Sequence, residues 1–213
     1  ADSRSVSFVI IPRTGVGNSM PLIFNYSDTE FSALLLGNFN SFVLDYICRQ
    51  KVSGGNLNFY VVKQLPLLPL KAYSECSLNF AGRSTVKWII ERVVELTYTS
   101  WDLKPFAEDM GVIRPPFTWN TDRRFEICAE LDALFFHLYL GMDYHSCPDS
   151  ELEGQIIENR EIVKHILETF PIVKKRDIEK YDTYKTAVQI LEYFDLMIQS
   201  LLNDEPYKSV NLY

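Results

Sequence analysis

The chain has 213 residues, of which 47% are hydrophobic and 14% aromatic, enough apolar material to build a core and to exclude a disordered protein. Its 21 basic and 28 acidic residues give a formal net charge of −7, which excludes a uniformly basic surface that grips nucleic acid without specificity. The charge is uneven, since residues 1–100 hold 9 basic and 7 acidic side chains, a net +2, which leaves −9 for residues 101–213. We therefore expect an anionic ligand to prefer the first half.

The first part of the chain has the pattern of a small mixed α/β lobe over residues 1–72. Runs of β-branched and aromatic residues that end at prolines predict strands, and a run with apolar residues at helical spacing predicts a helix. The expected elements are strands at 5–11 and 21–25, joined as a hairpin by the turn 13–20, a helix from Asp28 or Thr29 to Arg49 with an interruption at Gly37 and Asn38, and a strand at 57–65.

The second part, residues 73–213, is predicted to form an α-helical lobe, because apolar residues recur at helical spacing through most of it. The expected helices cover residues 84–98, 101–109, 121–141, 159–169 and 184–202. The fold class predicted from the sequence is therefore α+β, with the mixed lobe first and the helical lobe second.

The four cysteines, Cys48, Cys76, Cys128 and Cys147, form no C-x-x-C pair, so neither a zinc framework nor a disulfide-rich secreted domain is indicated. No apolar run approaches the ~18 residues of a membrane span, and the N-terminus lacks the pattern of a signal peptide. These features predict a soluble, cytoplasmic protein with reduced thiols and no membrane partner. Because the chain does not begin with Met, we expect it to be part of a longer protein.

Motifs of catalysis and cofactor binding are absent, and the weak candidates have simpler explanations. Gly15-Val16-Gly17 is followed by no helix, so a flexible hairpin tip is favoured over a phosphate cradle. His137, His145 and Cys147 supply no fourth zinc ligand, which favours packed or surface histidines. The carboxylates at 126–132 are typical of a solvated helix face, and Lys174-Lys175-Arg176 of a charged turn. We assign no catalytic residue, metal site or cofactor to this chain.

One segment, residues 49–63, reads as a binding site, because it carries a formal charge of +3 and no acidic residue. Its cations Arg49, Lys51 and Lys63 can contact phosphates, and Asn56 or Asn58 can bond to a base edge. The alternative interpretation is a helix end that runs into a core strand, with the first two cations complementing the helix dipole. Composition leaves both interpretations open.

Three blocks of sequence point to a family: FNSFVLDYICRQKVSGGNLNFYVVKQLPLLP, PFTWNTDRRFEICAELDALFFHLYLG and ILETFPIVKKRDIEKYDTYKTAVQILEYFD. In this order they resemble the C-terminal region of large bacterial restriction-modification proteins of the type IIG-like kind. There an adenine-specific DNA methyltransferase domain precedes a target-recognition and helical region. The resemblance runs from about Ser5 to Asp195. It implies that S-adenosylmethionine is a cofactor of the parent, whereas this chain, which has no Asn-Pro-Pro-Tyr motif, is not catalytic alone.

The resemblance also implies that the region around Asn40-Ser41 and Gln64-Leu65-Pro66 ends a target-recognition domain that helps to read DNA. Together with the basic first half, it predicts two partners in the bacterial cytoplasm, double-stranded DNA and the parent's methyltransferase domain, in a phage-defence system. The residues expected to contact DNA are Arg13, Arg49, Lys51, Asn56, Asn58 and Lys63. The competing hypothesis is a non-catalytic interaction module whose acidic helical half docks onto the parent's other domains and never contacts DNA. A free-standing enzyme is the third hypothesis and has the least support.

Overall fold

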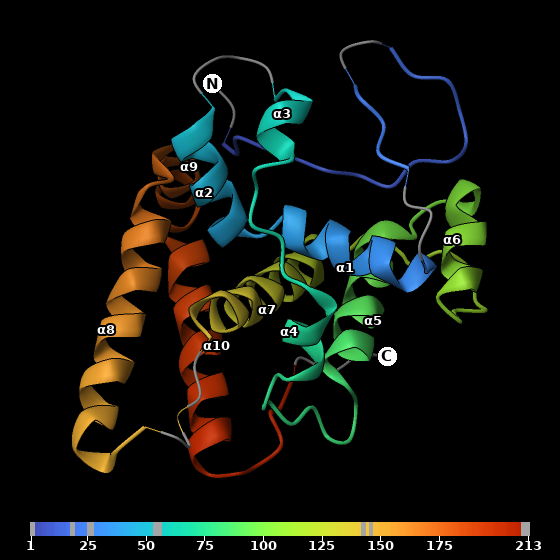
Figure 1. The fold of residues 1–213 in the computed structure, drawn as a ribbon. Helices are drawn as coiled ribbons and strands as arrows, with labels where there is room; N and C mark the ends of the chain where they lie inside the picture. Colours follow the sequence, from blue (N-terminus) through green and yellow to red (C-terminus); the bar gives the residue numbers. More distant parts are fainter. Residues whose placement is uncertain are drawn as a thin grey trace.

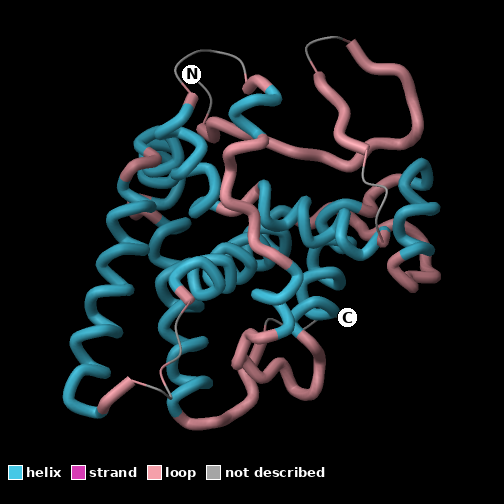
Figure 2. Tube along the Cα trace, viewed as in Figure 1, coloured by secondary structure: helices cyan, strands magenta, loops and turns pink. Residues whose placement is uncertain are grey.

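The computed structural model describes residues 3–17, 20–24, 28–52, 57–141, 144 and 147–209, and within these ranges the chain consists of helices and irregular segments without a β-strand (Figures 1 and 2). In chain order the elements are α1 (Thr29–Phe39), α2 (Phe42–Lys51), α3 (Phe59–Val62), α4 (Leu70–Ser74), α5 (Thr85–Thr97), the 3-10 helix η1 (Trp101–Leu103), α6 (Lys104–Asp109), α7 (Thr121–Leu140), α8 (Asp149–Glu168), α9 (Pro171–Tyr181) and α10 (Lys185–Leu202).

The predicted α+β class is wrong, because the described part of the chain is all-α and its N-terminal segment is irregular where strands were expected. The alternation in residues 5–11 does mark a packing face, since Val6 is buried and the Phe8 ring stacks on Phe39 with centroids 3.9 Å apart. The backbone of Phe8, however, is satisfied by a side chain: Asn40 Nδ2 donates to its carbonyl at 2.9 Å, and its N–H donates to Asn40 Oδ1 at 3.0 Å. A strand needs a neighbouring strand, and here an asparagine takes that place.

The strand predicted at 57–65 is also wrong, since the short helix α3 and a turn occupy this segment. Its β-branched and aromatic composition suggested a strand. Leu57, Val61 and Leu65 nevertheless lie four positions apart; Val61 and Leu65 are buried, and Leu57 and Leu65 belong to one small apolar cluster. This spacing brings side chains onto one face of a helix, and it overrides the β-propensity of the individual residues.

The helices predicted at 84–98, 121–141 and 184–202 are confirmed as α5, α7 and α10, whereas the helix expected at 159–169 is the second half of α8, which begins at Asp149. Ser84 accepts a hydrogen bond from Lys87 N–H at the start of α5, and Asn120 accepts one from Arg123 N–H at the start of α7. Gly141 ends α7 in the left-handed conformation, at φ 63°. Polar caps and a C-terminal glycine are therefore reliable markers in this chain.

Two predictions about helix ends are corrected by the structure. The interruption expected at Gly37 and Asn38 lies at Asn40–Ser41 instead, where Ser41 caps α2. Gly37 lies within α1, at a point where the helix passes so close to α7 that a Cβ at this position would lie 3.2 Å from the Phe135 ring. The charged turn expected at 174–176 is part of helix α9, which Pro171 opens in its first turn, a position where proline costs no hydrogen bond.

Helix α7 lies at the centre of the fold, with α10 on one side and α2 and α5 on others (Figure 1). Its side chains are buried from Ala129 to His137 without a break, which is typical of a helix enclosed by neighbours. Helix α1 packs on α5, and α8 and α9 pack on α10. The main core contains side chains from Ala33 to Tyr207. Of the helices described, none is long and apolar enough to cross a membrane by itself, and only α1 and α2 together, with a 69° bend between them, pass that test of length and composition.

Candidate nucleic-acid interface

Arg49, the first cation of the candidate segment, is half-buried and bound to other parts of the protein. Its Nη1 donates to the Thr169 carbonyl and its Nη2 to the Ser3 carbonyl, each at 2.9 Å. The guanidinium also lies over the Phe170 ring, 4.0 Å from the centroid. Arg49 therefore joins α2 to the turn between α8 and α9 and to the N-terminal segment. We do not count Arg49 among the residues free to contact a phosphate, because its guanidinium N–H groups already have partners.

A second arginine, Arg4, completes this internal junction. Its Nε pairs with Asp45 Oδ2 at 2.5 Å, its Nη2 donates to the Asn40 carbonyl at 2.6 Å, and its guanidinium lies 4.1 Å from the centroid of Phe42. Asp45 is fully buried on α2, and it also accepts from Ser5 N–H. A buried carboxylate requires such partners, so the start of the chain is fixed to α2 by charge as well as by packing. No feature of the sequence indicates a role for Arg4, since nothing in its neighbours marks an ion pair with a residue 41 positions away.

A small apolar cluster supports the rest of the candidate segment. It joins Val6 of the N-terminal segment, Cys48 of α2 and Leu65 after α3, and Val62 of α3 packs against it. Val61 is 3% exposed and Leu65 is 7% exposed, so these buried side chains anchor α3 to the helical body. The cluster brings the end of α2 and the whole of α3 to one side of the molecule.

The outward side of this cluster carries polar and aromatic groups. Lys51 at the end of α2, Asn58 before α3 and Lys63 at the end of α3 are all exposed. Phe59 and Tyr60 are exposed between them, at 52% and 61%. Asn58 precedes α3 without capping it through its side chain. We call Lys51, Asn58, Phe59, Tyr60 and Lys63 the α3 surface. Asn56, the sixth residue expected to contact DNA, lies outside the described residues.

The charge around the α3 surface is positive and unopposed locally. The sequence has no acidic residue at positions 46–74 and none at 3–27. Within the described ranges, no hydrogen bond or ion pair joins the side chains of Lys51, Lys63 or Arg13 to another residue. Arg13 is exposed in the irregular segment before α1, which extends from the same side of the helical body as α3 (Figure 1). Exposed cations on stretches of sequence without acidic residues favour contacts with phosphate groups.

Two buried titratable groups, Asp132 and His137, lie on α7 away from this surface. Asp132 accepts a hydrogen bond from Phe42 N–H at 2.7 Å, and burial raises its pKa to about 7 although Arg4 and this hydrogen bond act in the opposite direction. His137 stacks on Phe194, its Nε2 lies 3.1 Å from the Phe194 carbonyl, and burial lowers its pKa to about 4. Both side chains connect helices through backbone groups, which gives each a structural role.

A buried ion pair joins α5 and α7. Arg92 Nε donates to Glu130 Oε2 at 2.8 Å, and both side chains are completely buried. Tyr207 donates its hydroxyl to the other oxygen of Glu130 at 3.1 Å, and the Arg92 guanidinium lies 3.4 Å from the Trp88 ring centroid. Burial lowers the pKa of Arg92, and Glu130 opposes that change. The pair has no path to solvent for a substrate, and we interpret it as a bond between helices.

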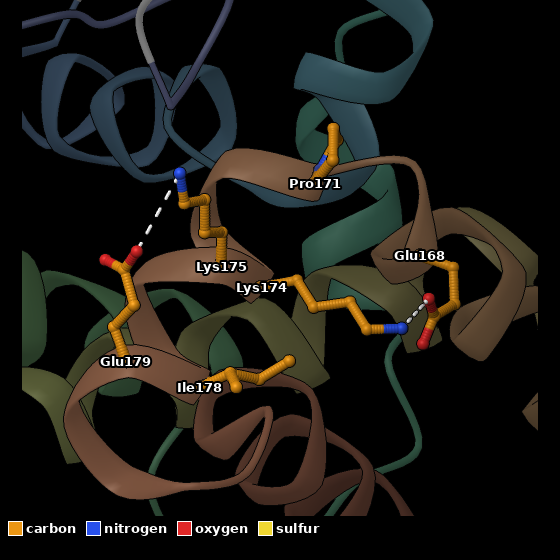
Figure 3. A pocket seen from close by; sticks show the side chains of 6 residues that line it. All are labelled: Glu168, Pro171, Lys174, Lys175, Ile178 and Glu179. Atoms are coloured by element: carbon orange, nitrogen blue, oxygen red, sulfur yellow. Dashed lines mark hydrogen bonds and ion pairs between the residues drawn. The ribbon is translucent and has the colours of Figure 1, made fainter.

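The hollow at the start of α9, with a volume of about 470 Å³, is shallow and its lysines are paired (Figure 3). Lys174 Nζ lies 2.5 Å from Glu168 Oε2, and Lys175 Nζ lies 3.8 Å from Glu179 Oε1. Carboxylates therefore compensate the basic cluster of the third sequence block. In the part of the chain that the structure describes, no three His, Cys, Asp or Glu side chains lie close enough to hold a metal ion. His145, one of the weak zinc candidates, is outside that part.

Comparison with known proteins yields no match to a family model, a curated protein or a solved structure.

Proposed function

We propose that this chain is the C-terminal part of a bacterial restriction-modification DNA methyltransferase, and that it contacts double-stranded DNA without carrying the methyltransferase active site. The observation that carries the DNA contact is the α3 surface, where Lys51 and Lys63 are exposed on a stretch without acidic residues. Membership of the family rests on the three sequence blocks. S-adenosylmethionine and the parent's methyltransferase domain enter the proposal through that resemblance.

The contacts between the three blocks support the view that they act together. Asp132 of the second block accepts from Phe42 N–H of the first, and Arg49 of the first donates to the Thr169 carbonyl of the third. His137 of the second block lies against Phe194 of the third. The residues that carry the resemblance are thus largely the residues that hold the helical body together. Such a body can present a variable surface while its own contacts stay the same.

Equilibrium binding to a short duplex tests the proposal. Lys51→Ala/Lys63→Ala removes two phosphate contacts, and we expect roughly tenfold weaker binding at ~0.1 M salt. Lys164→Ala/Lys175→Ala is the matched control, because it removes the same charge from exposed surface pairs on α8 and α9. Fluorescence anisotropy of a labelled duplex measures both. Equal weakening by both variants, or by neither, contradicts a DNA contact at the α3 surface.

A protein-docking role is the second candidate, and exposed apolar side chains near α6 favour it. Trp101, Ile113 and Trp119 are 61%, 89% and 64% exposed, in the half of the chain that carries a net −9. Side chains of this kind are enriched in protein interfaces, and the negative charge repels phosphate. Cross-linking in the full-length parent separates the two candidates: DNA adducts at α3 support the first, and DNA adducts confined to other domains support the second.

A further inference from the structure

The orientation of α3 places two aromatic rings in solvent. Val61 is buried and Leu65 lies in the small cluster, while Phe59 and Tyr60, earlier in the same turn, are 52% and 61% exposed. Adjacent exposed aromatic residues leave a large apolar area in contact with water. Since the anchors fix this turn to the helical body, the rings are held outward by the fold itself.

The surroundings of the rings identify the chemistry of their partner. Asn58, Lys63 and Gln64 beside them are exposed and polar, and no carboxylate occurs at positions 46–74. Lys63 follows Phe59 by four positions, which on a helical turn puts its ammonium group on the same side as the Phe59 ring. A protein partner would favour further apolar neighbours at the centre of the contact. Rings bordered by cations instead match a ligand with flat apolar faces linked by negative charges, as in a nucleic acid.

We infer that Phe59 and Tyr60 form a stacking platform for an unpaired DNA base, with Lys51 and Lys63 holding the phosphates beside it. This inference rests on the proposed function and specifies the form of DNA that the α3 surface takes. In an intact duplex the base faces are covered by their neighbours, so a ring can stack only on a base that has left the helix. The α3 surface should therefore prefer DNA with an extrahelical base over fully paired DNA.

Two duplexes of equal length test the inference, one with 2-aminopurine in a pair and one with 2-aminopurine in a single-base bulge. We expect the 213-residue chain to bind the bulged duplex more tightly and to change its 2-aminopurine fluorescence on binding. Phe59→Ala/Tyr60→Ala should weaken binding to the bulged duplex roughly tenfold and leave the paired duplex nearly unaffected. Phe59→Trp/Tyr60→Trp, which keeps the aromatic faces, should restore the preference. Trp101→Ala is the control, because Trp101 has the same 61% exposure as Tyr60 on another surface.

The outcomes separate this inference from the proposed function. If Lys51→Ala/Lys63→Ala leaves binding to the paired duplex unchanged, the proposed function fails. If that variant weakens binding but Phe59→Ala/Tyr60→Ala leaves the preference for the bulged duplex intact, or if no preference exists, only the stacking platform is overturned. If Phe59→Ala/Tyr60→Ala loses binding to the parent's methyltransferase domain without any loss of DNA binding, the stacking platform is also overturned, in favour of protein docking. Circular dichroism of each variant shows whether the fold is retained.

Discussion

Replacing Arg49 by Ala should destabilise the protein, because this residue joins three separate parts of the chain. The variant loses two hydrogen bonds to the carbonyls of Thr169 and Ser3, and it loses the stacking of the guanidinium on Phe170. Each hydrogen bond from a charged donor contributes about 1.5 kcal/mol, and the stacking contributes about 0.5 to 1 kcal/mol. Asp45 stays buried with Arg4 as its remaining cation. We expect the free energy of unfolding to fall by about 3 to 4 kcal/mol.

Urea denaturation followed by circular dichroism measures this loss. Lys51→Ala is the matched control, since it removes the same charge two residues later from an exposed side chain of α2 and should change the free energy of unfolding by less than about 0.5 kcal/mol. Arg49→Lys should recover only part of the loss, because an ammonium group does not reproduce the planar guanidinium that bridges two carbonyls and stacks on a ring. Equal stability of Arg49→Ala and Lys51→Ala would refute the assignment of Arg49 to the junction of α2, the N-terminal segment and the turn after α8.

Three further variants test the buried groups of α7. Asp132 has a raised pKa, about 7, so the free energy of unfolding of the wild type falls as pH rises from about 4 to 7. Asp132→Asn keeps an acceptor for Phe42 N–H. In urea titrations between pH 5 and 8, this variant should be more stable than the wild type by up to about 4 kcal/mol. His137 has a lowered pKa, about 4, so stability falls as pH drops from about 6.5 to 4, and His137→Phe should lose that dependence in thermal melts. Arg92→Met should lower the free energy of unfolding by about 3 to 5 kcal/mol, because it leaves Glu130 buried and unpaired. Adding Glu130→Leu in a double-mutant cycle should recover part of this loss. If the effects of the two substitutions are additive, the pairing is contradicted.

The sequence predicted the helical half well because local signals and tertiary packing agree there. Ser84, Asn120 and Gly141 mark helix ends by their own chemistry, and the structure uses each of them in that way. The first 70 residues mislead for a physical reason: apolar alternation indicates that a segment packs on one face but does not say what satisfies its backbone. For Phe8, the side chain of Asn40 supplies the backbone hydrogen bonds that a neighbouring strand would otherwise make.

The sequence indicates the candidate segment but does not sort its residues by exposure. Arg49, Lys51 and Lys63 look alike in the sequence, each a cation in the stretch 46–74 that has no acidic residue. Only the three-dimensional contacts separate Arg49, whose partners lie 46 and 120 positions away, from the two exposed lysines. Phe59 and Tyr60 lie in the segment predicted as a strand, and in the structure they lie exposed on the helical turn α3.

The salt dependence of duplex binding tests the DNA contact at the α3 surface most directly. A plot of log K against log salt concentration has a slope of about −0.9 for each phosphate contact, so Lys51→Ala/Lys63→Ala should make the slope shallower by about 1.8. The control Lys164→Ala/Lys175→Ala should leave it unchanged. A slope that is the same for wild type and both variants would contradict the account, because it would mean that the exposed lysines of the α3 surface do not meet phosphates.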